Sequence, residues 1–245
     1  MKRSLRKQIK QDELVSSWEQ FLTWAGTHQN EVRLWVVGIV LVAVVSGGLW
    51  YFRSQRLTES RIALDQAFRD FNATVATPEG GKGQADQPAS REEKYRKALA
   101  EFDGVARRYG SSTEGREARY YAALCRVELG ELDQAETDLR ALTQASGGAS
   151  AELIRELARL ALAETLRRQG QPGEAVTEYE KALAVPSPPI PTDHVLFEMA
   201  GALEEAGQLE KAATVYRRVV DEHPDSRYAQ DARTRSEYLS LGAKG

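Results

Sequence analysis

The sequence predicts an all-α chain in which one N-terminal transmembrane helix precedes a solenoid of stacked helical pairs. Two observations lead to this fold class. Residues 34–52 form an uninterrupted apolar run, and three later stretches share one pattern of small residues, glycine and large apolar residues. In addition, no run after residue 91 shows the period of two that marks a half-buried strand.

The apolar run LWVVGIVLVAVVSGGLWYF carries no charged side chain. As a helix rising about 1.5 Å per residue it would span about 28 Å, close to the hydrocarbon core of a bilayer. Trp35 at one end and Trp50 and Tyr51 at the other suit the headgroup region, where amphipathic rings settle. A core helix this long would show a polar stripe, and a cleaved signal would have a short basic start and a small-residue cleavage site. We therefore predict a membrane anchor at 34–52, with these three aromatic residues at its interfaces.

The residues before the anchor, 1–33, form a polar tail with one amphipathic stretch. Apolar residues recur there at spacings of three and four: Leu14, Trp18, Phe21, Leu22 and Ala25. Such a stretch could lie in the membrane interface or dock on a partner helix. A loosely ordered tail beside the bilayer fits the pattern equally well.

Three segments follow the anchor. Residues 53–76 keep a helical spacing of apolar side chains and are expected to extend the membrane helix. Residues 77–90, TPEGGKGQADQPAS, contain three glycines and two prolines without apolar periodicity, which predicts a flexible linker. Residues 91–245 alternate helical stretches with short breaks and are expected to form the repeat domain.

Three stretches, 121–142, 161–183 and 198–220, can be superimposed on one another. Each has a small residue, a glycine seven positions later, an alanine five further on and a large residue four beyond that. The residues in these four positions are Ala123, Ala163 and Ala200; Gly130, Gly170 and Gly207; Ala135, Ala175 and Ala212; and Leu139, Tyr179 and Tyr216. Small side chains allow two helices to approach closely, and glycine ends the first helix in a tight turn. A partial fourth unit shows only a second helix, with Ala98, Phe102 and Val105.

These units resemble tetratricopeptide repeats, in which such helix pairs stack into a solenoid. The small residues lie 40 and then 37 positions apart, whereas the family period is 34, so extra residues are expected in the connections near 146–150 and 186–191. The segment 226–241 would then be the terminal capping helix.

Composition and motifs argue against catalysis and against nucleic-acid binding. Residues 34–245 contain 27 basic and 32 acidic residues, whereas a nucleic-acid surface needs a concentrated basic face. The three histidines form no metal-ligand spacing, and phosphate loops and nucleophile elbows are missing from the sequence. Cys125, the single cysteine, has apolar neighbours and is expected to be buried. We predict no enzyme activity, no cofactor and no metal.

The resemblance implies a protein-binding surface lined by the first helix of each unit. Its inward positions fall on six residues: Tyr120, Leu124, Leu157, Leu160, His194 and Phe197. Charged residues fall at its edge: Glu128, Glu164, Arg168 and Glu205. An apolar groove would suit an amphipathic helix or an unfolded segment, and it lacks the Lys and Asn pattern that clamps a chaperone's carboxylate. The alternative is that these residues are core between stacked helices.

The order of tail, anchor, extension, linker and repeats resembles the YfgM-like family of bacterial inner-membrane proteins, which are ancillary to the Sec translocon. That resemblance implies a single-pass inner-membrane protein with a cytoplasmic N-terminus and a periplasmic repeat domain. It also implies translocon subunits, a membrane-anchored chaperone of the PpiD type and unfolded polypeptides as partners. A scaffold for an envelope complex and a cytosol-facing receptor remain alternatives, because the charges flanking the anchor do not settle its orientation.

Overall fold

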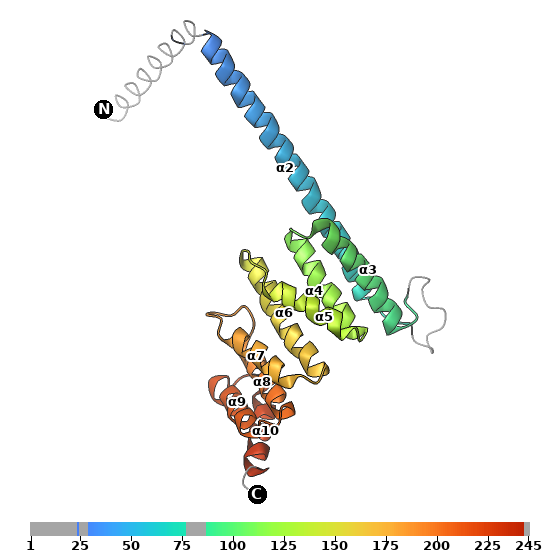
Figure 1. The fold of residues 1–245 in the computed structure, drawn as a ribbon, viewed down its shortest axis with the longest axis vertical. Coiled ribbons are helices and arrows are strands. Elements are labelled where there is room, and N and C mark those ends of the chain that lie inside the picture. The colour runs from blue at the N-terminus through green and yellow to red at the C-terminus, as the bar shows by residue number, and fades with distance from the viewer. Residues whose placement is uncertain (1–23, 25–28, 77–86, 243–245) are drawn as a thin grey trace, which may run out of the picture. The chain divides into compact units, whose positions relative to one another are not determined.

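The computed structural model describes residue 24 and residues 29–76 and 87–242, and the regular structure in these ranges is entirely helical. The predicted all-α class is therefore confirmed (Figure 1). The helices are α2 (Gln29–Phe71), α3 (Arg91–Tyr109), α4 (Thr113–Glu128), α5 (Leu132–Thr143), α6 (Ala149–Arg168), α7 (Pro172–Leu183), α8 (Thr192–Glu205), α9 (Leu209–Glu222) and α10 (Ala229–Gly242). Nearly all of the predicted tail up to residue 28, and residues 77–86 of the predicted linker, lie outside the described residues.

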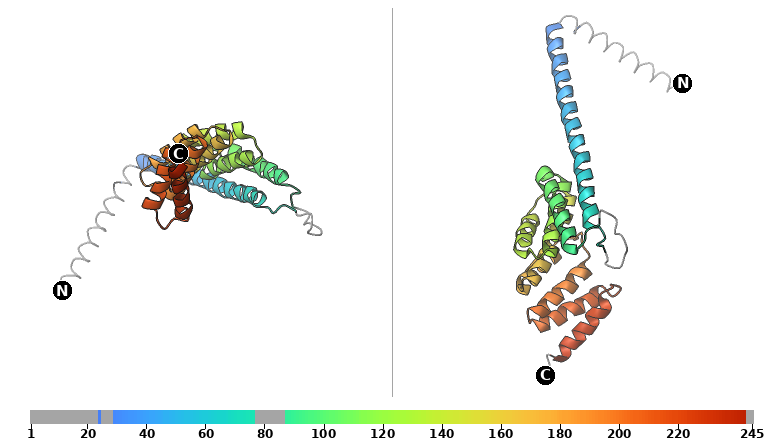
Figure 2. Two further views of the ribbon diagram at one scale, coloured as in Figure 1. Left: turned by 90° about the horizontal axis from the view of Figure 1, so that it is seen from below. Right: turned by 90° about the vertical axis from the view of Figure 1, so that its right-hand side faces the viewer.

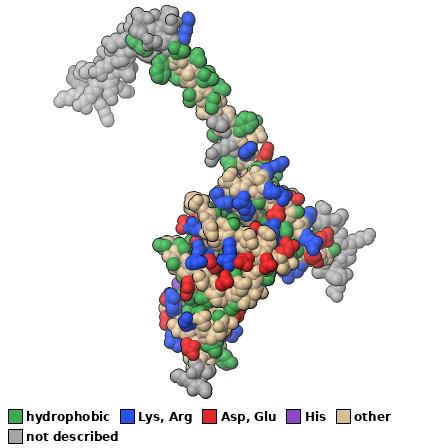
Figure 3. Space-filling view, in the orientation of Figure 1, with side chains coloured by type: hydrophobic (Ala, Val, Ile, Leu, Met, Phe, Trp, Pro, Cys, Tyr) green, Lys and Arg blue, Asp and Glu red, His purple; other side chains and the backbone are tan. Residues whose placement is uncertain are grey.

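The chain divides into two compact units, Met1–Thr58 and Glu59–Gly245. In the first unit, α2 carries the apolar run, and its side chains are exposed (Figure 3). Trp35 and Trp50, at opposite ends of the run, are 71% and 72% exposed, and Tyr51 is 56% exposed. The Ser46 hydroxyl donates to the carbonyl of Val42 at 2.7 Å, so this polar side chain is satisfied within the helix. By length and composition, α2 is the one helix in the described part of the chain that could cross a membrane.

In the second unit, three helical hairpins follow one another: α4 with α5, α6 with α7, and α8 with α9 (Figure 2). The three predicted turn glycines all adopt left-handed backbone conformations, with φ of 79° at Gly130, 75° at Gly170 and 72° at Gly207. In each turn, the N–H after the glycine donates to a carbonyl five residues back. These hydrogen bonds are Glu131 to Arg126 (2.9 Å), Gln171 to Leu166 (2.8 Å) and Gln208 to Leu203 (2.8 Å). This is the Schellman ending, which glycine permits without steric cost.

The hairpins close on the small residues that the repeat pattern marks. All six alanines of the pattern are 0% exposed, and the three large residues are at most 3% exposed: Leu139, Tyr179 and Tyr216. All of these residues except Ala135 belong to one hydrophobic cluster that runs from α4 to α10. The sequence pattern therefore identified the contacts that hold the helical pairs together.

The C-terminal part of α2 supplies the first helix of the partial fourth unit. Leu64 and Ala67 are buried in one cluster with residues of α3 and α4. Phe68 packs edge-on against Phe102 of α3 and Tyr121 of α4, with ring centroids 5.4 and 4.6 Å apart. The predicted repeat domain begins at residue 91, whereas the compact unit begins at Glu59, because these apolar side chains pack into the repeat core.

The last helix, α10, packs on α9 at the C-terminal end of the solenoid. Within α10, the side chains of Ala229, Ala232 and Leu239 are buried, whereas those of Tyr238 and Leu241 are exposed. The connections between hairpins are longer than the turns within them. They cover residues 144–148 and 184–191, which overlap the segments where extra residues are expected.

Candidate protein-interaction surface

The six predicted groove residues lie on the first helices of the three hairpins. Tyr120 and Leu124 are on α4, Leu157 and Leu160 on α6, and His194 and Phe197 on α8; each is partly buried. Four of them, Tyr120, Leu157, Leu160 and Phe197, pack against the same hydrophobic cluster. The structure thus joins these four through a shared core and leaves part of each side chain accessible.

Leu153 extends this row and was missed by sequence reasoning. It lies seven residues before Leu160 on α6, which places both on one helix face, and it is 42% exposed. The apolar spacing of Leu153, Leu157 and Leu160 is visible in the sequence and could have identified it. We call the seven residues on these helices the first-helix row: Tyr120, Leu124, Leu153, Leu157, Leu160, His194 and Phe197.

Tyr228, in the turn before α10, covers part of the first-helix row at its C-terminal end. Its ring stacks on Phe197 with centroids 4.9 Å apart and on His194 with centroids 5.5 Å apart. Its hydroxyl lies 3.0 Å from Nδ1 of His194, within hydrogen-bond distance. Tyr228 therefore fixes the position of His194 and covers part of Phe197. It makes no ring contact or hydrogen bond with Leu157 or Leu160.

Tyr120 contributes a partly buried phenol to the row. Its ring meets that of Tyr121 edge-on, with centroids 5.2 Å apart. Burial raises the pKa of the Tyr120 phenol to about 12, so this side chain, which is neutral at pH 7 in any case, also stays uncharged at moderately alkaline pH. It can therefore offer a ring and a neutral hydroxyl to a partner.

The charges predicted at the edge of the groove take part in ion pairs. Arg167 on α6 contacts Glu164 on its own helix at 3.2 Å and, on α8, Glu198 at 2.7 Å and Glu205 at 2.6 Å. The hydrogen bond to Glu205 raises the pKa of Arg167 above its usual range, although burial opposes the shift. Arg168 pairs with Glu164 at 3.1 Å. These pairs tie the second hairpin to the third beside the first-helix row.

Two carboxylates are buried between α6 and α7, which sequence reasoning did not anticipate. Alternating Glu and Arg residues along a helix usually mark a solvated face, but Glu156 is 1% and Glu178 6% exposed. Arg159 lies 3.2 Å from Glu156 and 3.9 Å from Glu178, and Lys181 donates to Glu178 at 2.7 Å. A carboxylate buried this deeply needs such cations, so the cluster holds α6 against α7 in one register.

The described residues contain no group of three or more His, Cys, Asp and Glu side chains that could hold a metal ion. Cys125 is 0% exposed, and burial raises the pKa of its thiol to about 12. A neutral, inaccessible thiol is a poor nucleophile. His223 lies 3.1 Å from the hydroxyl of Thr192, joining the end of α9 to the start of α8. These groups support packing.

Comparisons with known proteins match the helical repeats. A family model described as tetratricopeptide repeat-like domain matches residues 28–185, more than half of the chain. A second, described as tetratricopeptide repeat, matches residues 160–227. No curated protein matches the chain.

Solved structures of two proteins are similar at low identity. The MamA RS-1 ArsTM double mutant is 18% identical, covers 62% of this chain and 89% of its own, and has a TM-score of 0.42. A candidate kinesin light chain from Podosopora anserina with nearly identical TPR-like repeats is 17% identical, covers 75% and 95%, and has a TM-score of 0.47. Both scores lie below 0.5, and neither likeness supports a statement about function.

Proposed function

Because the chain belongs to the tetratricopeptide repeat-like domain family, we propose that it is a membrane-anchored module that binds proteins through its first-helix row. The observation that carries this proposal is the row itself. Tyr120, Leu157, Leu160 and Phe197 pack on one core cluster yet keep accessible surface on three successive first helices. Partly exposed apolar side chains in a continuous set are the usual mark of a surface for another polypeptide.

The partner proposed for this row is an amphipathic helix or an unfolded segment. Apolar side chains provide most of the contact area, and the neutral Tyr120 hydroxyl provides a hydrogen-bonding group. The ion pairs around Arg167 leave mixed charge beside the row rather than a single strong sign. Such a surface suits apolar sequences of varied composition better than one fixed charged motif.

The finer proposal is that the chain is an ancillary factor of the Sec translocon in the bacterial inner membrane. In this proposal residues 34–52 cross the membrane once, the N-terminus is cytoplasmic and the repeats are periplasmic. The repeats would then bind translocon subunits, a PpiD-like chaperone and emerging polypeptides. Its support is the order of an apolar helix followed by repeats, and the length and composition of α2. Anchoring would raise the effective concentration of the row near its partners, so weak contacts would suffice.

Binding through the row is tested by substituting Leu160→Ser and Phe197→Ser together in the full chain, held in lipid nanodiscs. The probe is reduced, carboxymethylated lactalbumin, which is permanently unfolded. We expect its capture to fall at least about tenfold, since two apolar anchors at about 1 kcal/mol each are lost. The control is Leu209→Ser, because Leu209 on α9 is also apolar and 42% exposed but lies outside the row. Unchanged capture by a variant with native helicity would refute binding through the row.

Photo-crosslinking from position 160 separates client handling from a scaffold role. A ladder of adducts in cells would support the handling of many polypeptides, whereas one sharp adduct would favour a fixed partner in an envelope complex. The side of the membrane is tested by protease treatment of spheroplasts carrying a tag after Gly245. Digestion with the inner membrane intact supports periplasmic repeats, and protection until detergent is added would favour a cytosol-facing receptor.

A further inference from the structure

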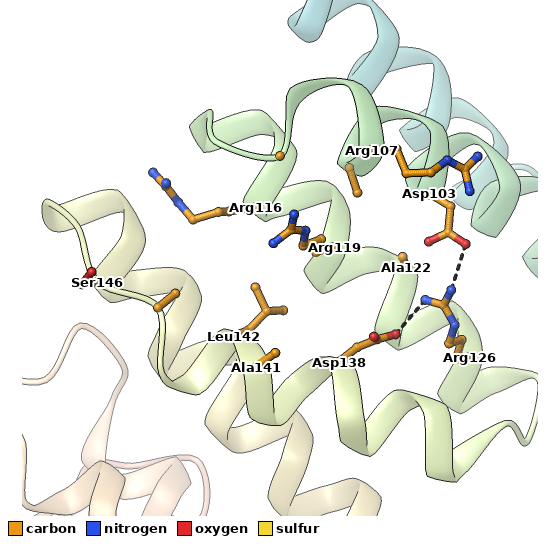
Figure 4. A pocket seen from close by; sticks show the side chains of 13 residues that line it. Asp103, Arg107, Arg116, Arg119, Ala122, Arg126, Asp138, Ala141, Leu142 and Ser146 are labelled. Atoms are coloured by element: carbon orange, nitrogen blue, oxygen red, sulfur yellow. Dashed lines mark hydrogen bonds and ion pairs between the residues drawn. The ribbon is translucent and has the colours of Figure 1, made fainter.

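A cavity of about 450 Å³ lies among α3, α4 and α5, apart from the first-helix row (Figure 4). From α4 it is lined by Arg116, Arg119, Ala122 and Arg126. At about 100° per residue, the last three of these leave α4 roughly 100–160° away from Tyr120 and Leu124. Arg116 lies closer to the row, at about 40–80° from the same two residues, but none of the residues that line the cavity belongs to the row.

One end of the cavity is internally neutralised. The Arg126 guanidinium contacts Asp103 of α3 at 2.8 Å and Asp138 of α5 at 3.0 Å, and its side chain is 15% exposed. Figure 4 shows this Asp–Arg–Asp bridge at one side of the cavity. Among the described residues, neither aspartate pairs with a second arginine of the lining.

Three further arginines at the cavity have no carboxylate partner among the described residues. They are Arg107 on α3 and Arg116 and Arg119 on α4. Four arginines against two aspartates give the lining a net charge of +2, within a chain whose residues 34–245 carry five more acidic than basic residues. By contrast, the arginines of α5 and α6, such as Arg140 and Arg167, form ion pairs. Three guanidinium groups without a carboxylate partner among the described residues therefore line this one cavity.

The rest of the lining is mostly apolar, and Ser146 is its one further polar side chain. Ala106, Ala122, Ala141, Leu142 and Ala145 contribute to the lining. Figure 4 shows Arg116 and Arg119 projecting from the same side of α4, across from Ala141 and Leu142 of α5. A ligand that fits must therefore present both negative charge and apolar surface. A free phosphate has no apolar part.

We propose that this cavity binds an acidic peptide segment of a partner protein. Its carboxylates pair with Arg116 and Arg119, whose planar guanidinium groups match carboxylates with two hydrogen bonds each. An intervening apolar side chain rests on the surface formed by Ala141 and Leu142. A volume of about 450 Å³ holds a few side chains, which fits a short segment rather than a folded domain. This proposal rests on the proposed function as a protein-binding module but uses a separate site.

The test is fluorescence anisotropy with the full chain in nanodiscs of zwitterionic lipid. The probe is a labelled synthetic peptide in which Glu and Leu alternate, and the same peptide with Gln in place of Glu is its control. We expect Kd for the Glu peptide to rise at least about tenfold in the double variant Arg116→Glu, Arg119→Glu. Raising ionic strength from about 0.1 M to about 1 M should also weaken binding, since the Debye length shortens from about 10 Å to about 3 Å.

A matched control removes the effect of net charge. Arg217 and Arg233, on α9 and α10, are exposed and have no carboxylate partner among the described residues, so Arg217→Glu, Arg233→Glu changes the chain's charge equally at another place. This control should leave Kd unchanged. The milder double variant Arg116→Gln, Arg119→Gln should also weaken binding, and circular dichroism confirms that each variant is folded.

Several outcomes would overturn the proposal. The first is equal affinity for the Glu and Gln peptides, and the second is an equal loss of peptide affinity in the cavity variant and in the Arg217→Glu, Arg233→Glu control. The third is binding of anionic vesicles that depends on Arg116 and Arg119 without binding of the peptide, which would make the cavity a lipid-headgroup site. The Leu160→Ser, Phe197→Ser variant separates this proposal from the first-helix row. It should keep its affinity for the Glu peptide, and loss of that affinity would show that the peptide binds the row instead. If the unsubstituted chain fails to capture the unfolded protein but binds the Glu peptide, binding through the row is refuted and peptide binding at the cavity is supported.

Discussion

The contribution of α2 to the repeat core can be tested by the substitution Phe68→Ala. Phe68 lies before the segment 77–86, on the helix that carries the apolar run. Its half-buried ring contacts Phe102 and Tyr121 of two other helices. If residues 59–71 are the first helix of the N-terminal hairpin, removing this ring must loosen α3 and α4 as well.

The magnitude follows from burial and ring contacts. Truncating a fully buried Phe to Ala costs about 3–5 kcal/mol, and partial exposure of Phe68 reduces this. Each edge-on ring pair adds about 0.5–1.5 kcal/mol beyond the buried area. We therefore expect local stability to fall by about 2–4 kcal/mol. At 1.4 kcal/mol per tenfold change, the population of the open state should rise roughly 30- to 700-fold.

Cys125 provides the assay, because it is the one cysteine of the chain and lies in the same cluster as Leu64 and Phe102. It is 0% exposed, so a maleimide reacts with it only when this part of the repeat domain opens. The labelling rate is measured on the full chain in detergent. As long as the open state is a small fraction of the molecules, this rate is proportional to the equilibrium constant for local opening. We expect this rate to rise by the factor given above in the Phe68→Ala variant.

Ile62→Ala is the matched control, since Ile62 is on the same helix but 61% exposed. Its labelling rate should stay within about twofold of the unsubstituted chain. Equal labelling rates in the two variants would refute the assignment of α2 to the repeat core. The boundary would then return to residue 91, as the sequence alone suggested.

Three further predictions concern the hairpins and their ion pairs. Gly170→Ala should lower the free energy of unfolding by about 1–2 kcal/mol in urea titrations, because its φ of 75° is strained for alanine. The control Gly173→Ala, within α7, should be neutral or stabilising. Equal effects of the two substitutions would contradict the turn geometry. The hydrogen bond from Arg167 lowers the pKa of Glu205, so its contribution is present above the carboxyl's unfolded pKa and is lost as pH falls through the folded one. Glu205→Gln should therefore cost less than about 1 kcal/mol at pH 7, and this cost should shrink as the pH of the urea titration is lowered. A cost that stays the same from pH 7 down to the lowest pH at which the chain remains folded would argue against the pair. Arg126→Gln should cost about 1–3 kcal/mol, since two aspartates then face each other without a cation, and an unchanged urea midpoint would contradict this.

The hairpins were predictable because their determinants are local. Gly130, Gly170 and Gly207 stand at fixed distances from small residues, and each position has one physical reason for its residue type. The role of residues 59–71 was less accessible. Leu64 and Phe68 show helical spacing, but the segment 77–90 separates them from their partners in sequence, and only packing reveals that it connects two helices of one hairpin.

The candidate sites divide in the same way. The first-helix row follows from repeat position, and the spacing from Leu153 to Leu160 extends it. The arginine cavity combines residues of three helices between positions 103 and 146, and its charge balance depends on Arg126 engaging both aspartates. No local spacing encodes that arrangement. The buried Glu156 was missed for a similar reason, since i,i+4 pairing suggests solvent exposure while its burial depends on α7.

The hairpin turns are uniform, but the connections between hairpins are not. Residues 144–148 and 184–191 differ in length, whereas the three glycine turns share one hydrogen-bond pattern. An insertion or deletion in a connection would change the angle between neighbouring hairpins while each hairpin kept its own turn and alanine contacts. A chain built in this way can fit a partner of a different curvature through a change of a few loop residues, with every binding side chain left in place.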